Sequence, residues 1–122
     1  MNVPFTDDEK AIWELLQTHL GHESAIQIDA LCARTGLSER QVKGAVSYLI
    51  LRHKFRIGSC RNKKIGAGYF VIRTPEEIEQ TVRPLRAQAL TMLRRIAILE
   101  GKPARKVYRE MLGQLEIDFE AA

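Results

Sequence analysis

The stretch Thr35–Ile50 reads TGLSERQVKGAVSYLI and decides the fold. It opens with Thr-Gly, which is typical of the end of a helix, and continues with Ser38-Glu39-Arg40-Gln41, the pattern of a capping box. The Ser38 hydroxyl is expected to accept a hydrogen bond from the Gln41 backbone, while the Gln41 side chain accepts one from the Ser38 backbone. The stretch therefore predicts a tight turn over residues 35–38 and a helix from there to about His53.

This helix is expected to have two different faces. Apolar residues recur at helical spacing and should face a core: Val42, Ala45, Val46, Leu49 and Ile50. A second stripe holds Arg40, Lys43, Gly44 and Ser47. Its cations can contact phosphates or base edges, and its small residues let the backbone approach a surface closely. Tight packing against another helix is the alternative reason for Gly44, because glycine costs about 1 kcal/mol relative to alanine inside a helix.

Two shorter helices are expected upstream. Thr6-Asp7-Asp8-Glu9 is another capping box and predicts a helix that ends at Gly21. Residues 24–28 alternate apolar and polar side chains, which is typical of a short strand. Asp29 is then expected to cap a helix over Ala30–Arg34.

Downstream of His53 the sequence period changes to two. Phe55-Arg56-Ile57 and Tyr69-Phe70-Val71-Ile72 predict two strands of a hairpin. The loop between them carries three cations, Arg61, Lys63 and Lys64. Such cations can lie along a phosphate backbone without being buried.

Positive charge is concentrated in the middle of the chain. The net charge is +4, but residues 34–64 contain nine Lys and Arg residues against one Glu, a formal charge of +8. Residues 1–33 have a formal charge of −5. This pattern indicates a surface that binds a polyanion, most simply nucleic acid. A solvated surface balanced by the acidic first third is the alternative.

The order of helix, short strand, helix, turn, helix and basic hairpin resembles that of winged helix-turn-helix proteins, with the likeness carried by Ile28–Ile50 and Phe55–Ile72. In that family the third helix enters the DNA major groove and the wing contacts the backbone or the minor groove. The resemblance implies double-stranded DNA as a partner, although some winged helices bind proteins instead. The implied recognition-helix residues are Ser38, Arg40, Gln41, Lys43, Gly44 and Ser47, and the implied wing residues are Arg61, Lys63 and Lys64.

A long helix is expected after the hairpin, because Thr74-Pro75-Glu76-Glu77 is a strong helix start. Apolar residues then step by four and three over three heptads, as in a coiled-coil seam: Ile78, Val82, Leu85, Ala89, Met92, Ile96 and Leu99. Pro84 is expected to interrupt and bend the helix early. The seam predicts a homodimer. The alternative is a helix that folds back over its own head.

A short helix and a free tail are expected after Gly101-Lys102-Pro103, with Gly113 ending the helix. The last residues include Gln114-Leu115-Glu116-Ile117-Asp118-Phe119, which resembles the six-residue peptide that binds the bacterial sliding clamp. The resemblance implies clamp contacts from Gln114, Leu115, Ile117 and Phe119. A terminal strand packed on the protein or its dimer mate is the alternative.

These patterns predict a mainly α chain with a small β-hairpin, an α+β class, organised as a winged helix-turn-helix followed by a long helix. The expected parts are a DNA-binding domain over 1–73, a dimerisation helix over 74–101, and a short helix with a tail over 102–122. The layout resembles small phage and prophage proteins and implies a role in replication or transcription regulation. A protein-interaction adaptor that docks on the clamp is the other function considered.

Other classes of protein are disfavoured. No apolar run approaches the ~20 residues of a membrane span, and the acidic N-terminal segment does not resemble a signal peptide. Two cysteines without a Cys-x-x-Cys motif suit a reducing compartment, so a cytoplasmic location is expected. No catalytic or nucleotide-binding motif is present, and His19 and His22 lack partners at metal-ligand spacing, so neither an enzyme nor a cofactor or metal is expected.

Overall fold

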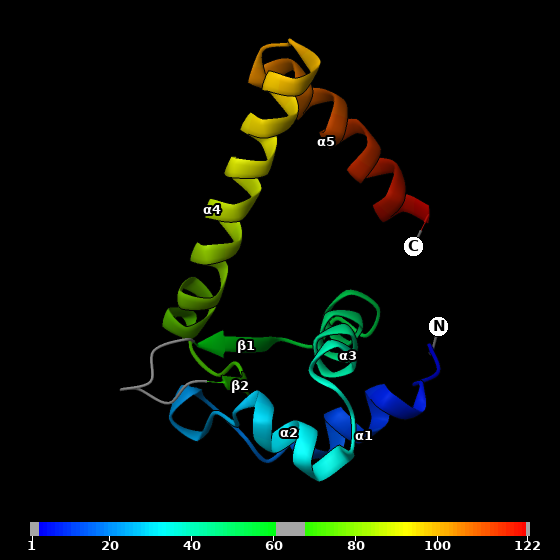
Figure 1. Ribbon diagram of the computed structural model, residues 1–122, viewed down its shortest axis with the longest axis vertical. Coiled ribbons are helices and arrows are strands. Elements are labelled where there is room, and N and C mark those ends of the chain that lie inside the picture. Colours follow the sequence, from blue (N-terminus) through cyan, green and yellow to red (C-terminus); the bar gives the residue numbers. More distant parts are fainter. Residues whose placement is uncertain (1–2, 61–67, 122) are drawn as a thin grey trace. The chain divides into compact units, whose positions relative to one another are not determined.

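The computed structural model describes residues 3–60 and 68–121, and of residues 118–121 the backbone only. The chain is mainly helical, with one small two-stranded antiparallel sheet and a long helix in its C-terminal half (Figure 1). This confirms the expected mainly α class with a small β component. The chain divides into two compact units, Met1–Thr81 and Val82–Ala122.

Helix α1 spans Asp7–Leu16 and begins with the predicted capping box. The Thr6 hydroxyl accepts from the Glu9 backbone at 3.2 Å, and the Glu9 carboxylate accepts from the Thr6 backbone at 3.0 Å. The helix ends at Leu16, so the predicted end at Gly21 is wrong. The reason is tertiary, because Leu20 forms a bridge with Val71 and the Gly21 N–H donates to the Val71 carbonyl at 2.9 Å.

Helices α2 and α3 follow a short 3-10 turn, η1, at His22–Ser24. Helix α2 spans Ile28–Thr35 and begins earlier than expected, so that Asp29 lies inside its first turn and does not cap it. Gly36 ends α2 in the left-handed conformation with φ +75°, as the predicted turn requires. Helix α3 spans Glu39–Leu51 and begins with the predicted Ser38 capping box.

The two strands are β1, Ile57–Cys60, and β2, Gly68–Val71, and they pair antiparallel with Ile57 opposite Val71. On the other side of β2, Ile26 exchanges two backbone hydrogen bonds of 2.9 Å with Tyr69. The strand expected over residues 24–28 is therefore a single bridge. A Cβ atom at Gly68 would collide with the Ile26 carbonyl, so this close pairing requires glycine.

The core of the first unit lies among the three helices and the sheet, which Figure 1 shows grouped together. Its buried residues are Ile12, Leu16, Ile26, Leu31, Val42, Ala45, Val46, Leu49 and Ile57. Four of them come from one face of α3, as the apolar spacing predicts. Ile50 was expected to join them but is 40% exposed, because it lies at the edge of that face.

A buried hydrogen bond and a stack of rings connect α1 to the segment that follows α3. The His53 Nε2 atom lies 3.2 Å from the Glu9 carboxylate, and both side chains are buried. The His53 ring stacks on Phe5 at 4.1 Å between centroids, and Phe55 stacks on Trp13 at the same distance. These contacts fix the path by which α3 leads into β1.

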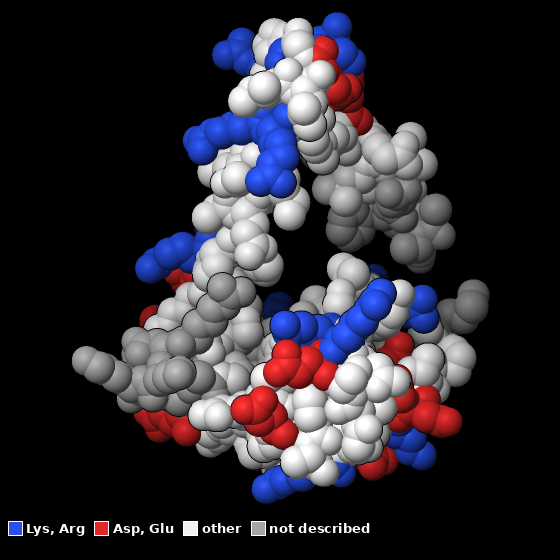
Figure 2. Space-filling view, viewed as in Figure 1, with Lys and Arg blue, Asp and Glu red and all other residues white. Residues whose placement is uncertain are grey.

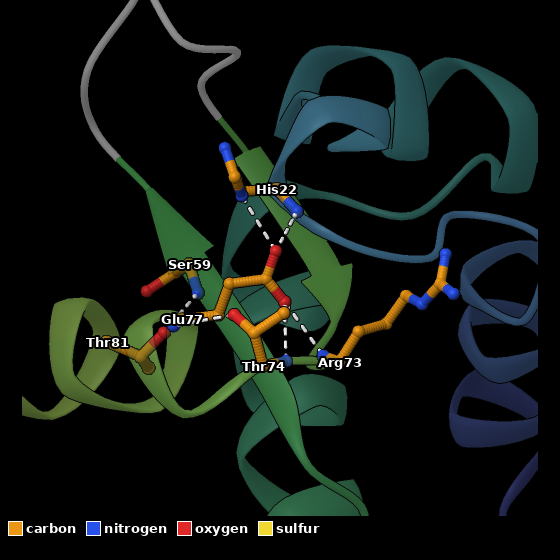
Figure 3. Close-up of polar contacts among 6 residues, drawn as sticks. All are labelled: His22, Ser59, Arg73, Thr74, Glu77 and Thr81. Carbon is orange, nitrogen blue, oxygen red and sulfur yellow. Dashed lines mark hydrogen bonds and ion pairs between the residues drawn. The ribbon is translucent and has the colours of Figure 1, made fainter.

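Helix α4 spans Pro75–Glu100, and its start, which belongs to the first unit, is held there through Glu77 (Figure 3). The Thr74 hydroxyl accepts from the Glu77 backbone at 3.2 Å, as the helix-start pattern predicts. The Glu77 carboxylate is buried and accepts from the backbone N–H groups of Arg73 at 2.7 Å and His22 at 2.8 Å. The start of α4 is thereby held against the turn that follows α1.

Helix α4 continues through Pro84, so the expected interruption there is wrong. Gly101, with φ +65°, ends α4, and α5 then spans Ala104–Ala121. Helix α5 also continues through Gly113, so the expected free tail is helical. Gly113 does not adopt a positive φ, and the good helix formers around it offset its cost of about 1 kcal/mol.

The second unit has a small interior. Among its described side chains, only Ala97 and Val107 are buried, and both lie close to the turn between α4 and α5. From this turn the part of α4 after Val82 and α5 diverge (Figure 1). None of the described helices is long and apolar enough to cross a membrane.

Candidate nucleic-acid interface

The exposed face of α3 is the strongest candidate for a binding surface. Arg40, Lys43 and Ser47 are exposed on the side of the helix opposite the buried residues Val42, Ala45, Val46 and Leu49. Positions three and four apart on a helix are neighbours, with about 5–6 Å between their Cβ atoms. The structure therefore brings Arg40, Lys43 and Ser47 together in one row, as the sequence predicts.

Both cations of this row are available to a ligand. Across the described ranges 3–60 and 68–121, neither Arg40 nor Lys43 forms an ion pair. Figure 2 shows Lys and Arg side chains together on the face of the first unit that carries α3, with acidic side chains beside them. Among the described residues, no carboxylate forms an ion pair with either cation.

Gly44 lies in the same row and has open space above it. A Cβ atom built at Gly44 would have no other atom within 4 Å. Tight packing against another helix is therefore not the reason for this glycine within the described structure. Its missing side chain instead exposes the α3 backbone to any surface that approaches the row.

Ser38 and Gln41 hold the start of α3 in place. The Ser38 hydroxyl accepts from the Gln41 backbone at 3.2 Å, and the Gln41 side-chain oxygen accepts from the Ser38 backbone at 2.9 Å. These bonds occupy both side-chain oxygens, which leaves the Ser38 hydroxyl proton and the Gln41 amide NH₂ for a ligand. Their first role is to position Arg40 and Lys43.

One apolar side chain at the end of α3, Leu51, was missed at the sequence level. Leu51 is 70% exposed and Tyr48 is 47% exposed, and the Arg52 guanidinium lies 4.2 Å from the centre of the Tyr48 ring. Leu51 is four positions after Ser47 and extends the same row. That spacing was the signal available in the sequence.

The remaining cations of the basic block are less concentrated. Arg34 lies on α2, and Arg52, Lys54 and Arg56 lie between the end of α3 and β1, and all four are exposed. The predicted wing residues Arg61, Lys63 and Lys64 fall outside the described residues, between the ends of β1 and β2. Of the basic block, α3 itself carries two exposed cations, Arg40 and Lys43.

The predicted seam residues lie along one side of α4. Leu85, Ala89, Met92 and Leu99 are exposed, whereas Ile78, Val82 and Ile96 are partly buried. Leu85 is 57% exposed, Met92 58% and Leu99 79%. Within the second unit, Val82–Ala122, the middle of the seam is therefore not covered by described side chains.

The clamp-like peptide lies within α5 rather than in an extended tail. Leu115 is 51% exposed and Ile117 is 61% exposed. Residues two positions apart point to different sides of a helix, so these two cannot enter one cleft while α5 stays helical. The alternative of a terminal strand is also wrong. Gln114 is helical as well, and the Phe119 side chain lies outside the described part.

His19 and His22 each contact another part of the fold, and the two cysteines do not form a disulfide. His19 Nδ1 lies 2.7 Å from the Ser24 carbonyl, and His22 Nδ1 lies 2.7 Å from the Glu77 carboxylate. Cys32 and Cys60 are free thiols. Over the described residues, no three His, Cys, Asp or Glu side chains come together as metal ligands would.

Comparisons with protein-family models, with curated proteins and with solved structures found no match to this chain. The functional argument therefore rests on the residues and their geometry.

Proposed function

We propose that this protein binds double-stranded DNA through the exposed face of α3, as a winged helix-turn-helix protein does. The observation that carries the proposal is the row of Arg40, Lys43 and Ser47, all exposed, with open space above Gly44. Arginine and lysine can contact guanine O6 and N7 in the major groove or pair with phosphates. A helix without a side chain at position 44 can lie deeper in the groove.

The arrangement around α3 supports a winged helix. Helices α2 and α3 are joined by the short turn at Gly36–Ser38, and α3 leads through residues 52–56 into the two antiparallel strands. In this architecture the segment between β1 and β2, which carries Arg61, Lys63 and Lys64, is the wing. Replication or transcription control in a phage or a bacterium is the setting that we propose for this activity.

Binding of a labelled duplex, measured at several salt concentrations, tests the proposal. Each phosphate contact made by a cation contributes about 0.9 to the slope of log affinity against log salt concentration, so a slope of several units is expected. A purified protein that does not bind duplex DNA, or binds it with no dependence on salt, would contradict the proposal.

Docking on the sliding clamp is a second candidate, favoured by Ile117. The apolar residues Tyr108, Met111, Leu112 and Leu115 recur at spacings of three and four along α5, as an amphipathic helix requires. Ile117 falls outside this stripe and is 61% exposed. Amphipathic packing therefore does not account for Ile117, whereas the Gln-Leu-x-Ile-x-Phe pattern does.

This second function requires the end of α5 to unwind before the peptide enters the clamp. A pull-down of purified bacterial sliding clamp by the intact protein tests it. Loss of the clamp on combined Gln114→Ala and Phe119→Ala substitution is the expected result, and retention of the clamp by that variant would remove this function.

A further inference from the structure

We infer that α4 is a surface for a second copy of this chain and that the two α4 helices pair in parallel. This inference goes beyond DNA binding and does not depend on it. It starts from the exposed d positions of the α4 seam, Leu85, Met92 and Leu99. Within the second unit, Val82–Ala122, no described side chain buries them.

A helix with so little packing needs a partner. Helices gain most of their stability from burying an apolar face, and isolated helices are marginal in water. Only Ala97 and Val107 are buried among the described side chains of the second unit, while Leu85, Met92 and Leu99 stay more than half exposed. A second copy of the same seam would cover this row by knobs-into-holes packing.

The residue types along the seam favour two parallel strands. Steps of three and four place Val82, Ala89 and Ile96 at the a positions, with Leu85, Met92 and Leu99 at the d positions. β-branched residues at a combined with leucine at d favour parallel two-stranded coiled coils. Ile78, at the first d position, departs from this rule, whereas the successive pairs Val82–Leu85 and Ile96–Leu99 follow it.

The charges beside the seam also select the orientation. In a parallel pair Arg95, at a g position, faces Glu100, at the following e position of the other copy, and the two charges attract. Glu100 Oε2 lies 3.8 Å from Lys102 Nζ in its own chain, and the side chain is 42% exposed, so it stays accessible.

Two leucines of nearly equal exposure provide a matched test of the surface. Leu85 is on the seam and 57% exposed, whereas Leu90 is off the seam and 53% exposed. Sedimentation of the full-length protein should show that Leu85→Asn weakens self-association by tenfold or more while Leu90→Asn leaves it near the wild-type value. Helical circular dichroism checks that both variants fold. Equal effects of the two substitutions, or a wild-type protein that stays monomeric, would overturn the inference.

Disulfide cross-linking tests the orientation of the two α4 helices. The experiment uses a variant in which Cys32→Ser and Cys60→Ser remove the native thiols. Residues 85 and 99 are separated by about 21 Å along a helix. In a parallel pair Leu85→Cys and Leu99→Cys should each form a disulfide with its own copy under mild oxidation. An antiparallel pair could bring at most one of these two positions close to its own copy, so a failure of either variant to cross-link with itself would refute parallel pairing.

A charge swap tests the proposed ion pair. Arg95→Glu and Glu100→Arg should each weaken self-association, because each sets like charges opposite one another. The double variant should recover most of the loss, since it restores an attractive pair with reversed signs. Losses that simply add in the double variant would count against the Arg95–Glu100 contact.

Discussion

His22 and Glu77 are 55 positions apart in the sequence, yet the His22 Nδ1 atom lies 2.7 Å from the Glu77 carboxylate (Figure 3). Because an ionised carboxylate only accepts hydrogen bonds, Nδ1 must carry the proton. Burial by itself raises the pKa of Glu77, but hydrogen bonds from the Arg73 and His22 backbones, the His22 ring and the Thr74 backbone lower it from 4.5 to about 2. Within the first unit, the pair fastens the start of α4 to the turn that follows α1.

Glu77→Gln should lower the free energy of unfolding by about 1–3 kcal/mol at neutral pH, because the amide NH₂ would face N–H donors. The charge of Glu77 adds stability that is complete above about pH 4.5 and is lost as the pH falls toward 2, on the order of 3 kcal/mol in total. Chemical denaturation between pH 5 and pH 2 should therefore show that the free energy of unfolding falls less steeply with decreasing pH in the variant than in the wild-type protein. Glu76→Gln, at an exposed neighbour, is the control and should keep the wild-type slope.

Arg40→Ala combined with Lys43→Ala should weaken duplex binding by tenfold or more, since one bidentate base contact alone accounts for about 1–3 kcal/mol. The slope against salt should become smaller by about one unit for each phosphate contact removed. The matched control is Arg105→Ala combined with Lys106→Ala, which removes the same two residue types from exposed positions on α5. If both pairs weakened binding equally, net charge and not the α3 face would explain the affinity.

Gly44→Ala should separate stability from function. Alanine favours a helix by about 1 kcal/mol over glycine, and the added methyl group meets no other atom within 4 Å, so the variant should unfold at higher denaturant concentration. The same methyl group would stand between the α3 backbone and the duplex and should reduce affinity. Equilibrium denaturation and duplex titration of one preparation measure both effects. A more stable variant with unchanged affinity would show that the α3 backbone does not approach DNA closely at this position.

Gly113→Ala should weaken clamp docking if docking requires α5 to unwind. The substitution favours the helix by about 1 kcal/mol and meets no neighbouring atom, which corresponds to roughly fivefold weaker docking. Calorimetric titration with purified clamp measures this, with Glu116→Ala as a control at a position that the peptide pattern leaves free. Tighter binding by the Gly113→Ala variant would show that the clamp accepts the helical form.

Much of the α3 site followed from short-range patterns. Each of its features depends on residues no more than four positions apart in the sequence. These features are the Ser38–Gln41 capping box, the turn at Gly36, and the division of α3 into a buried and an exposed face. Where prediction failed, the cause was a contact with a distant segment or a neglected balance of local costs. Helix α1 ends early because Gly21 bonds to Val71, and α5 continues through Gly113 because the surrounding helix formers outweigh one glycine.

The sequence by itself determined where helices start and which side of α3 carries Arg40 and Lys43, since these depend on hydrogen bonds and side-chain directions that repeat every three or four residues. Only the tertiary structure decided that Glu77 would be buried against His22 and that Ile26 would join β2. Those contacts unite segments more than forty residues apart, and their partners are chosen by packing in three dimensions, which no local spacing encodes.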